Sequence, residues 1–404
     1  MSFESGTVAP SDIATPAGSG GFLASLLSGQ PIPAMAARVT AWIAALWGRP
    51  IRLGTKVIVA RHAQVAEVLA RDLDFRIAPI NEARIDEVNG PFVLGMDRGV
   101  TLERERHALY QALAGVDLAP LREAVATQAS TRVAAAGTEI DIVGSYARPI
   151  AANTARGLFG IAGSDEQTYM DVARAIFAHT FLNLSGDKTV EARAVRAAAL
   201  MRNWFDGEIA RRRAAADFGA DMMGRLLDAG LLDDDGVRRT LGGMLVGSID
   251  TTATAVAKII AMIGRDASLA RRIAADVDDE ARLAGWCREA LRRWPHNPIL
   301  LRRAVASTRL ADTEIRAGDD IVAYTQAAML DASVFPNPGQ LRPDRPVNAY
   351  LHFGAGLHPC AGRVVNAFQI PLLVGALVRR GIASVGSVQW AGPFPDHLTL
   401  RFGR

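Results

Sequence analysis

One short stretch of the chain combines the residue types needed for thiolate chemistry. Residues 353–362 are FGAGLHPCAG, so three glycines and a proline bend a loop that presents Cys360. A long apolar helical pattern begins at Ala361, which places the thiol at or just before a helix N-terminus. Unpaired N–H groups and the helix dipole there stabilise a thiolate and lower its pKa. Such a thiolate can act as a nucleophile or a metal ligand, whereas a lone cysteine is more often a small buried hydrophobe.

A second stretch places polar side chains inside an apolar helix. The helical pattern from about Val237 to Arg265 contains VGSIDTTAT, in which Asp250, Thr251 and Thr252 follow one another. Polar groups in such a position are costly unless they are paired. A threonine hydroxyl that bonds to the carbonyl one turn earlier would locally loosen the helix. Alone, this motif is only a weak indication of function.

A third feature is the pair formed by Glu289 and Arg292 in the helical pattern AGWCREALRRW. Residues three apart share one helix face, so the two side chains can form a salt bridge. Such pairs are common on surfaces, where they contribute little to stability. The pair becomes informative through its position between the other two motifs.

In this order and at these separations, the three motifs resemble those of the cytochrome P450 superfamily. The match in the cysteine loop, residues 353–362, comprises Phe353, Gly354, Gly356, His358, Cys360 and Gly362. The resemblance implies that Cys360 is the axial ligand of a haem iron, an arrangement that favours O–O cleavage. It further implies that Phe353 shields the sulfur, that the glycines pass close to the macrocycle, and that His358 lies within reach of a haem propionate. The expected fold is mainly α with small β-sheets (α+β), with heme b between the long central helix and the cysteine loop with the last helix.

The resemblance also assigns roles to the central helix. Asp250 and Thr251 match the acid–alcohol pair that delivers protons during oxygen activation. Gly247 matches the first small residue that faces the haem. Ser248 stands where the second is usually glycine, so its hydroxymethyl group could hydrogen-bond a water or crowd the oxygen site.

Three further residues are expected to be structural. Glu289 and Arg292 match the E-x-x-R signature of the family, in which the pair is buried beneath the haem. Arg345, in the segment LRPDRP, matches the arginine that joins this pair. We therefore interpret the three as scaffold.

Candidate propionate ligands come from two other segments. Arg106 lies in the charged run ERERH, which is either a solvated helix face or, by resemblance, the source of a propionate ligand. Bacterial members of this family often carry a histidine where this chain has Leu102. One contact to a haem propionate would therefore be missing or supplied by His107. Arg302 and Arg303 are rivals for a further propionate contact, and their spacing to Ala317-Gly318 favours Arg302.

The substrate pocket is expected to be apolar. Residues 72–99 lose helical periodicity and contain two prolines and several glycines, which is typical of a long functional loop. By resemblance this loop lines the pocket. The candidate pocket residues share an apolar character and come from four segments: Phe92, Val93, Phe181, Ile299, Leu300 and Phe394. Phe394 is placed at the tip of a predicted hairpin over residues 388–402.

Composition narrows the class of protein. The 404 residues show no linker, and we expect a flexible tail over 1–20 and a single domain over 21–404. A formal net charge of +3 gives no reason to expect nucleic acid. Cys287 and Cys360 form no disulfide framework, which suits a reducing compartment. The apolar run 241–263 contains Asp250 and Lys258, which argues against a membrane span and favours a cytoplasmic protein.

Together these features predict a haem-thiolate monooxygenase that hydroxylates a small hydrophobic substrate with O2. Electrons would come from a separate ferredoxin, with its reductase, that docks near Arg104, Arg106 and Arg363. One alternative is a peroxygenase that uses hydrogen peroxide, favoured by Ser248. Another is a haem-thiolate binding or sensing protein without turnover.

Overall fold

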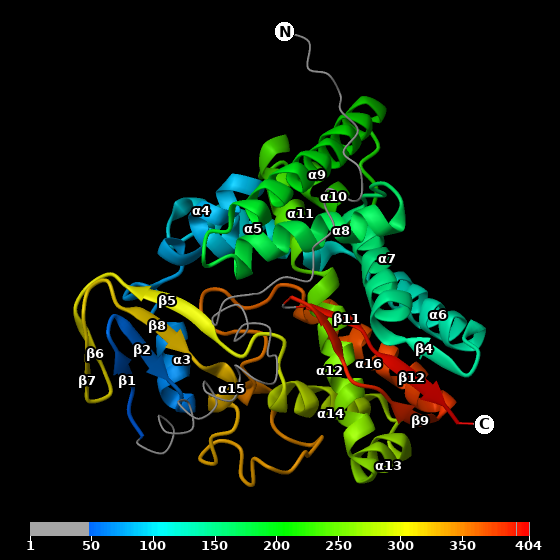
Figure 1. Ribbon diagram of the computed structural model, residues 1–404. Coiled ribbons are helices and arrows are strands. Elements are labelled where there is room, and N and C mark those ends of the chain that lie inside the picture. The colour runs from blue at the N-terminus through cyan, green and yellow to red at the C-terminus, as the bar shows by residue number, and fades with distance from the viewer. Residues whose placement is uncertain (1–47, 393, 404) are drawn as a thin grey trace.

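The computed structural model describes residues 48–392 and 394–403, so the predicted tail over 1–20 lies outside the described residues. Helices make up most of this part of the chain (Figure 1). The helices are α3 (His62–Ala70), α4 (Ala78–Val88), α5 (Val100–Gly115), α6 (Ala119–Ala135), α7 (Arg148–Phe159), α8 (Glu166–Phe177), α9 (Lys188–Ala215), α10 (Met222–Ala229), α11 (Asp234–Val246), α12 (Ile249–Arg265), α13 (Ala267–Ala275), α14 (Glu280–Arg293), α15 (Thr325–Ala328) and α16 (Arg363–Arg380). Shorter helical turns are η2 (Val93–Gly95), η3 (Ile142–Ala147), η4 (Ala178–Leu182) and η5 (Val347–Ala349).

Four small sheets accompany the helices. Their strands are β1 (Ile51–Leu53), β2 (Lys56–Val59), β3 (Phe75–Arg76), β4 (Glu139–Asp141), β5 (Leu300–Ala304), β6 (Thr308–Leu310), β7 (Thr313–Ile315), β8 (Asp320–Ala323), β9 (Ile382–Val385), β10 (Gln389–Ala391), β11 (Phe394–His397) and β12 (Thr399–Phe402). The largest sheet has the order β1-β2-β8-β5-β3, and within it β2 and β8 are parallel while the other pairs are antiparallel. The predicted mainly α fold with small sheets is therefore confirmed.

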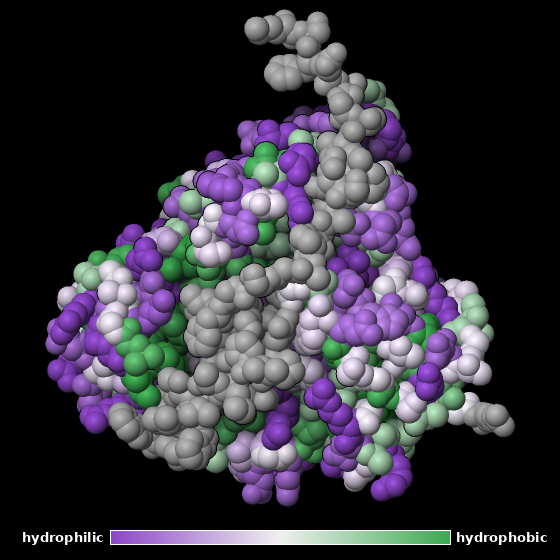
Figure 2. Space-filling view, viewed as in Figure 1, coloured by the Kyte–Doolittle hydropathy of each residue, from purple (hydrophilic) through white to green (hydrophobic). Residues whose placement is uncertain are grey.

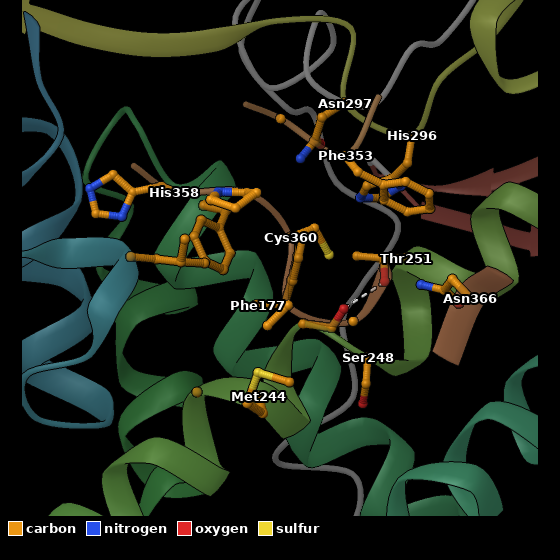
Figure 3. Close-up of a pocket in the computed structure, with 18 of the residues that line it drawn as sticks. Phe177, Met244, Ser248, Thr251, His296, Asn297, Phe353, His358, Cys360 and Asn366 are labelled. Atoms are coloured by element: carbon orange, nitrogen blue, oxygen red, sulfur yellow. Dashed lines mark hydrogen bonds between the residues drawn. The ribbon is translucent and has the colours of Figure 1, made fainter. Parts of the chain in front are cut away.

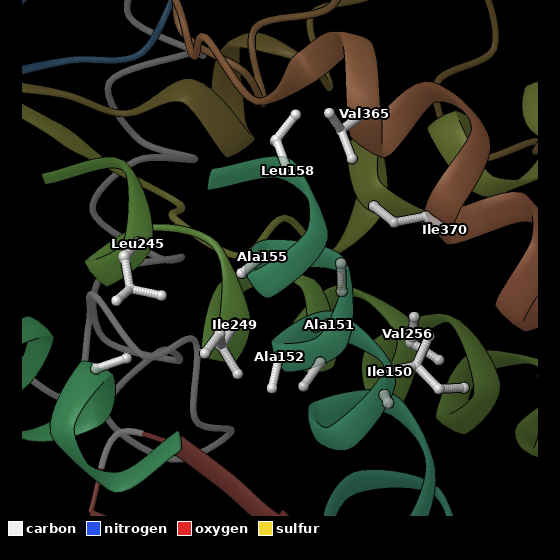
Figure 4. Close-up of a cluster of buried hydrophobic side chains, with 14 of the residues drawn as sticks. Ile150, Ala151, Ala152, Ala155, Leu158, Leu245, Ile249, Val256, Val365 and Ile370 are labelled. Atoms are coloured by element: carbon white, nitrogen blue, oxygen red, sulfur yellow. The ribbon is translucent and has the colours of Figure 1, made fainter. Parts of the chain in front are cut away.

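One part of the largest hydrophobic cluster lies between α7 and α12, with residues of α11 and α16 beside them (Figure 4). Small side chains on α7, such as Ala151 and Ala155, let the helices approach closely, and larger residues such as Val256 and Ile370 fill the remaining space (Figure 4). Hydrophilic side chains dominate the outward faces of the helices in the upper part of the molecule (Figure 2). The site described below thus rests on rigid, well-packed helices.

Two predicted elements differ from the structure. Residues 72–99, expected to be an irregular loop, contain α4, because Pro79 lies in the first turn, where a helix tolerates proline. The helix expected from Val237 to Arg265 is two segments, α11 and α12, separated at Gly247 and Ser248. Residues 234–265 together are long and apolar enough to cross a membrane, but 78% of the most apolar window is buried inside the protein. We therefore interpret α11 and α12 as core helices.

Candidate active site

The cysteine loop is held in one conformation by glycine geometry. Gly354 and Gly356 have φ of 69° and 72°, in the left-handed region that favours glycine. A Cβ atom at Gly356 would collide with the carbonyl oxygen of Leu69 on α3. The backbone N–H of Cys360 donates to the carbonyl of Phe353 at 2.8 Å, which closes the loop just before α16. Cys360 therefore lies at the predicted helix N-terminus.

The pKa of Cys360 differs from the expectation. Burial raises the pKa of this thiol above its ordinary value, although the backbone N–H groups of Gly362 and Arg363 act in the opposite direction. The prediction that the helix N-terminus lowers the pKa was therefore wrong for the protein alone, because burial outweighs the helix contribution. A bound metal cation would deprotonate such a thiol.

The sulfur opens onto a cavity of about 330 Å³ that is mostly apolar. Figure 3 shows Cys360 and Thr251 directed into the same space. Of the predicted site residues, the structure brings Arg106, Gly247, Ser248, Thr251, Arg302, Phe353, His358, Cys360 and Gly362 to its lining. Segments more than 250 residues apart in the sequence thus converge on one cavity.

Two arginines and a histidine lie together in one part of the lining. Arg106 comes from α5, Arg302 from β5 and His358 from the cysteine loop. Burial, followed by the charges of Arg302 and Arg106, lowers the pKa of His358 to about 4, so the three groups lie near one another. Burial also lowers the pKa of Arg302 to about 10, and its guanidinium donates only to the carbonyl of Leu301 among the described residues.

Successive side chains of β5 point to opposite faces of the sheet, so only one of Arg302 and Arg303 faces the cavity. Arg302 is 6% exposed and lines the cavity, whereas Arg303 pairs with Asp320 at 2.8 Å on the other side of the strand. His107 is exposed and is not part of the lining, so it does not supply the contact that the sequence left open at Leu102.

The break between α11 and α12 exposes polar groups to the cavity. The hydroxyl of Thr251 donates to the carbonyl of Gly247 at 2.6 Å, and that of Ser248 donates to the carbonyl of Leu245 at 2.8 Å. The hydroxyl of Thr252 lies 2.8 Å from the carbonyl of Ser248. These side-chain bonds compete with the helical hydrogen-bond ladder, which accounts for the loosened turn.

Asp250, which is predicted to deliver protons together with Thr251, is not part of the cavity lining. It is 3% exposed, and its Oδ1 accepts from Arg174 at 2.7 Å and lies 3.1 Å from Nε of Arg148. Burial raises the pKa of Asp250, but the charges of Arg174 and Arg148 outweigh burial and leave the pKa below its ordinary value. Asp250 is therefore an ionised anchor for two buried arginines.

Five of the six predicted pocket residues line the cavity. Phe92, Val93, Phe181, Ile299 and Leu300 contribute to an apolar wall. Phe394 does not, because it is 1% exposed and packs behind Phe177 with ring centroids 5.7 Å apart. The hairpin that carries it, β10 with β11, supports the cavity wall from outside.

The predicted scaffold residues meet in a buried cluster. Glu289 accepts from Arg292 at 2.7 Å and from Arg345 at 3.2 Å, and it also accepts from the hydroxyl of Tyr350 at 2.8 Å. Glu289 and Arg292 are both fully buried. The cluster joins α14 to the segment that leads into the cysteine loop, so it fixes the position of that loop.

Several residues at the site were not found from the sequence. Arg148 and Arg174 interrupt apolar helical stretches, a pattern that indicates buried charged partners but does not identify Asp250 as that partner.

His296 lines the cavity, and within the described residues its ring nitrogens have no hydrogen-bond partner. Burial, then the charge of Lys258, lowers the pKa of His296 to about 3, so the ring is neutral. Asn366, on α16, accepts from Thr252 at 3.1 Å and ties the two helices together.

Comparisons with known proteins agree with this geometry. The family model described as Cytochrome P450 matches residues 191–380. The chain is similar to a mycinamicin IV hydroxylase/epoxidase from Micromonospora griseorubida, 26% identical over 65% of each chain. It is also similar to a cyclooctat-9-en-7-ol 5-monooxygenase from Streptomyces melanosporofaciens, 28% identical over 71% of this chain and 72% of the relative. The chain thus spans just under two thirds of the length of the first relative and somewhat more of the second.

Solved structures match a larger share of the chain. The crystal structure of CalO2 superposes with a TM-score of 0.81 at 22% identity, covering 92% of this chain and 98% of that one. P450BioI in complex with an acyl carrier protein ligated to hexadec-9Z-enoic acid gives a TM-score of 0.79 at 17% identity, over 91% and 98% of the two chains. At these identities the likeness establishes the fold.

Proposed function

Since the chain belongs to the cytochrome P450 superfamily, we propose that it is a haem-thiolate monooxygenase that uses O2 to hydroxylate a small hydrophobic molecule. The observation that carries the proposal is that the Cys360 thiol, Arg106, Arg302 and the Thr251 hydroxyl surround one apolar cavity. A cytoplasmic location, favoured by the bacterial relatives, belongs to the same proposal.

The residues of the cavity fit heme b. Gly354 and Gly362 keep the backbone beside Cys360 free of side chains, as a flat macrocycle requires. Arg302 and Arg106 are cations without a carboxylate partner within 4.0 Å among the described residues, which suits the two propionates of the group. Cys360 would hold the iron, and His358 would lie beside the propionates. Haem with a thiolate ligand supplies the chemistry that cleaves the O–O bond.

The other residues position the substrate and the protons. Thr251 holds its hydroxyl at the loosened turn and can exchange a proton with a group in the cavity, because its oxygen can both donate and accept. Gly247 has no side chain there, and the Ser248 hydroxyl is turned back to a carbonyl of its own helix. The apolar wall formed by Phe92, Phe181 and Ile299 excludes water and orients a hydrophobic substrate.

We propose that a separate ferredoxin, together with its reductase, supplies the electrons. Arg104 and Arg363 are exposed and can form part of a basic docking surface near the cysteine loop. Arg106 is half-buried in the cavity lining, so we assign it to the propionates and not to docking. Electrostatic steering predicts that reduction slows as ionic strength rises. Stopped-flow reduction with an unchanged rate in added salt would contradict this docking surface.

One observation favours a second candidate, a peroxygenase that uses hydrogen peroxide. Asp250 is held away from the cavity by Arg148 and Arg174, so the acid–alcohol pair expected from the sequence is not assembled there. Peroxide carries its own protons and does not need that pair. Product formed with peroxide alone, at the yield obtained with O2 and a reductant, would support this candidate.

The absorption spectrum of the reduced, carbon monoxide-bound protein tests the proposed function. We expect a strongly red-shifted Soret band in the wild type and in Cys287→Ser, which removes a buried cysteine outside the cavity. The band should be lost in Cys360→Ser. A wild-type band typical of a histidine-ligated haem, or its persistence in Cys360→Ser, would overturn the proposal.

A further inference from the structure

Helix α4 presents one side chain to the cavity that the proposed chemistry does not use. Ile77, Ile80, Asn81 and Arg84 recur at helical spacing and line the cavity together. Arg84 lies where α4 meets η4, since its Nε donates to the carbonyl of Thr180 at 2.9 Å. A guanidinium is thus fixed at the edge of an apolar cavity.

The hydrogen bonds of Arg84 leave its charge uncompensated. Its Nε and Nη2 donate to the carbonyls of Thr180 and Ile80, both of which are neutral acceptors. Within residues 48–392 and 394–403, Arg84 forms no ion pair and its Nη1 forms no hydrogen bond. The acidic neighbour Glu87 lies 2.9 Å from His179 instead. Burial lowers the pKa of Arg84, and no neighbouring charge opposes that shift.

The charged residues described in the cavity lining do not include a partner for Arg84. Among the described residues, the lining contains three arginines and no aspartate or glutamate. In the proposed function, Arg106 and Arg302 would be matched by the two carboxylates of haem. Within the part of the chain that the structure describes, Arg84 remains as one positive charge without an ionic partner, a costly state for a partly buried group.

We propose that Arg84 binds the carboxylate of an otherwise apolar substrate, an inference that rests on the proposed function and specifies its substrate class. A planar guanidinium can donate two parallel hydrogen bonds to a carboxylate. The bonds to Thr180 and Ile80 already fix its orientation, so little side-chain freedom is lost on binding. The apolar remainder of the substrate would lie against Phe92 and Phe181.

Calorimetric titration of the haem-loaded protein with matched ligands tests this inference. The probes are octanoic, dodecanoic and hexadecanoic acids, each compared with the alcohol of the same chain length. In the wild type, at least one acid should bind about tenfold more tightly than its alcohol. Arg84→Met should weaken that acid by about tenfold to a hundredfold and leave the alcohol unchanged, whereas Arg84→Lys should restore part of the affinity.

Arg202→Met provides the matched control. Arg202 is exposed on α9 and outside the cavity lining, so its removal changes the net charge by the same amount without touching the site. This variant should bind acids as the wild type does. The inference is overturned if no acid exceeds its alcohol by more than about threefold, or if Arg202→Met weakens the acid as much as Arg84→Met.

The two proposals can fail separately. A red-shifted carbon monoxide band that requires Cys360, together with equal binding of acids and alcohols, would refute the role of Arg84 and keep the proposed function. A preference for acids that requires Arg84, in a protein without the thiolate band, would refute the proposed function and keep the carboxylate site.

Discussion

Replacing Asp250 by asparagine tests whether this residue is a structural anchor. The substitution keeps the shape of the side chain but removes the charge that compensates Arg174 and Arg148, both of which are buried. Removing one partner of a buried ion pair typically costs about 3–5 kcal/mol. Arg174 retains Asp396 at 2.9 Å and Arg148 retains Asp171 at 3.5 Å, so we expect a loss near the lower limit, about 3 kcal/mol.

The loss can be measured as a change in the melting temperature of the haem-loaded protein. For a chain of 404 residues, the unfolding entropy near Tm is about 0.8 kcal/mol/K, so a loss of about 3 kcal/mol lowers Tm by about 4 °C. Asp396→Asn is the matched control, because its side chain is 53% exposed and contacts the same Arg174. This control should cost less than about 1 kcal/mol. Equal melting of Asp250→Asn and the wild type would refute the reasoning, as would equal losses in the two variants.

The pH dependence gives an independent check on the same anchor. The pKa of Asp250 in the folded protein lies below its unfolded value of about 3.9. Its contribution to stability is therefore complete above that value and is lost as the pH falls through the folded-state pKa. The difference in Tm between wild type and Asp250→Asn should shrink below about pH 4, and a constant difference would contradict the assignment.

Three further changes probe other parts of the site. Burial holds the pKa of Lys258 at about 7 in the folded protein, below its unfolded value of about 10.4. The free energy of unfolding in urea should therefore rise with pH between these two values in the wild type, relative to Lys258→Met. Parallel pH curves for the two proteins would contradict this. Tyr350→Phe removes the 2.8 Å bond to Glu289 and should lower the free energy of unfolding by about 1–3 kcal/mol, so an unchanged urea midpoint would show that the bond is not needed. Thr251→Ala should keep the carbon monoxide spectrum but lower the product formed per O2 consumed, and an unchanged yield would exclude a proton-handling role for its hydroxyl.

The local motifs could be predicted because each depends on residues close together in the sequence. The cysteine loop places Cys360 before α16 as expected, and the i, i+3 pair Glu289 and Arg292 shares one face of α14. The choice between Arg302 and Arg303 needed the register of β5 against β8, which depends on long-range strand pairing. Sequence spacing favoured the arginine that lines the cavity but could not show which face of the strand is buried.

The features that the sequence did not predict depend on contacts between distant parts of the chain. The resemblance paired Asp250 with Thr251, but the sequence could not show that the Asp250 carboxylate meets Arg148 and Arg174 from other helices. Phe394 was expected to reach the substrate pocket from a hairpin tip, yet tertiary packing places it behind Phe177 and outside the cavity lining. The N–H groups near Cys360 were expected to dominate its pKa, whereas the extent of burial, which only the folded protein defines, decides the direction.

The contact between Gly356 and the carbonyl of Leu69 has a consequence for the order of folding. It joins segments almost 290 residues apart, and the bond from His62 to the carbonyl of Ala349, 2.8 Å long, spans a similar separation. Contacts this distant in sequence close large loops and form slowly. The thiol of Cys360 therefore reaches its position only after the early strands and α3 have met the last third of the chain. Until residues 349–362 have left the ribosome, a nascent chain holds no formed cofactor site beside Cys360.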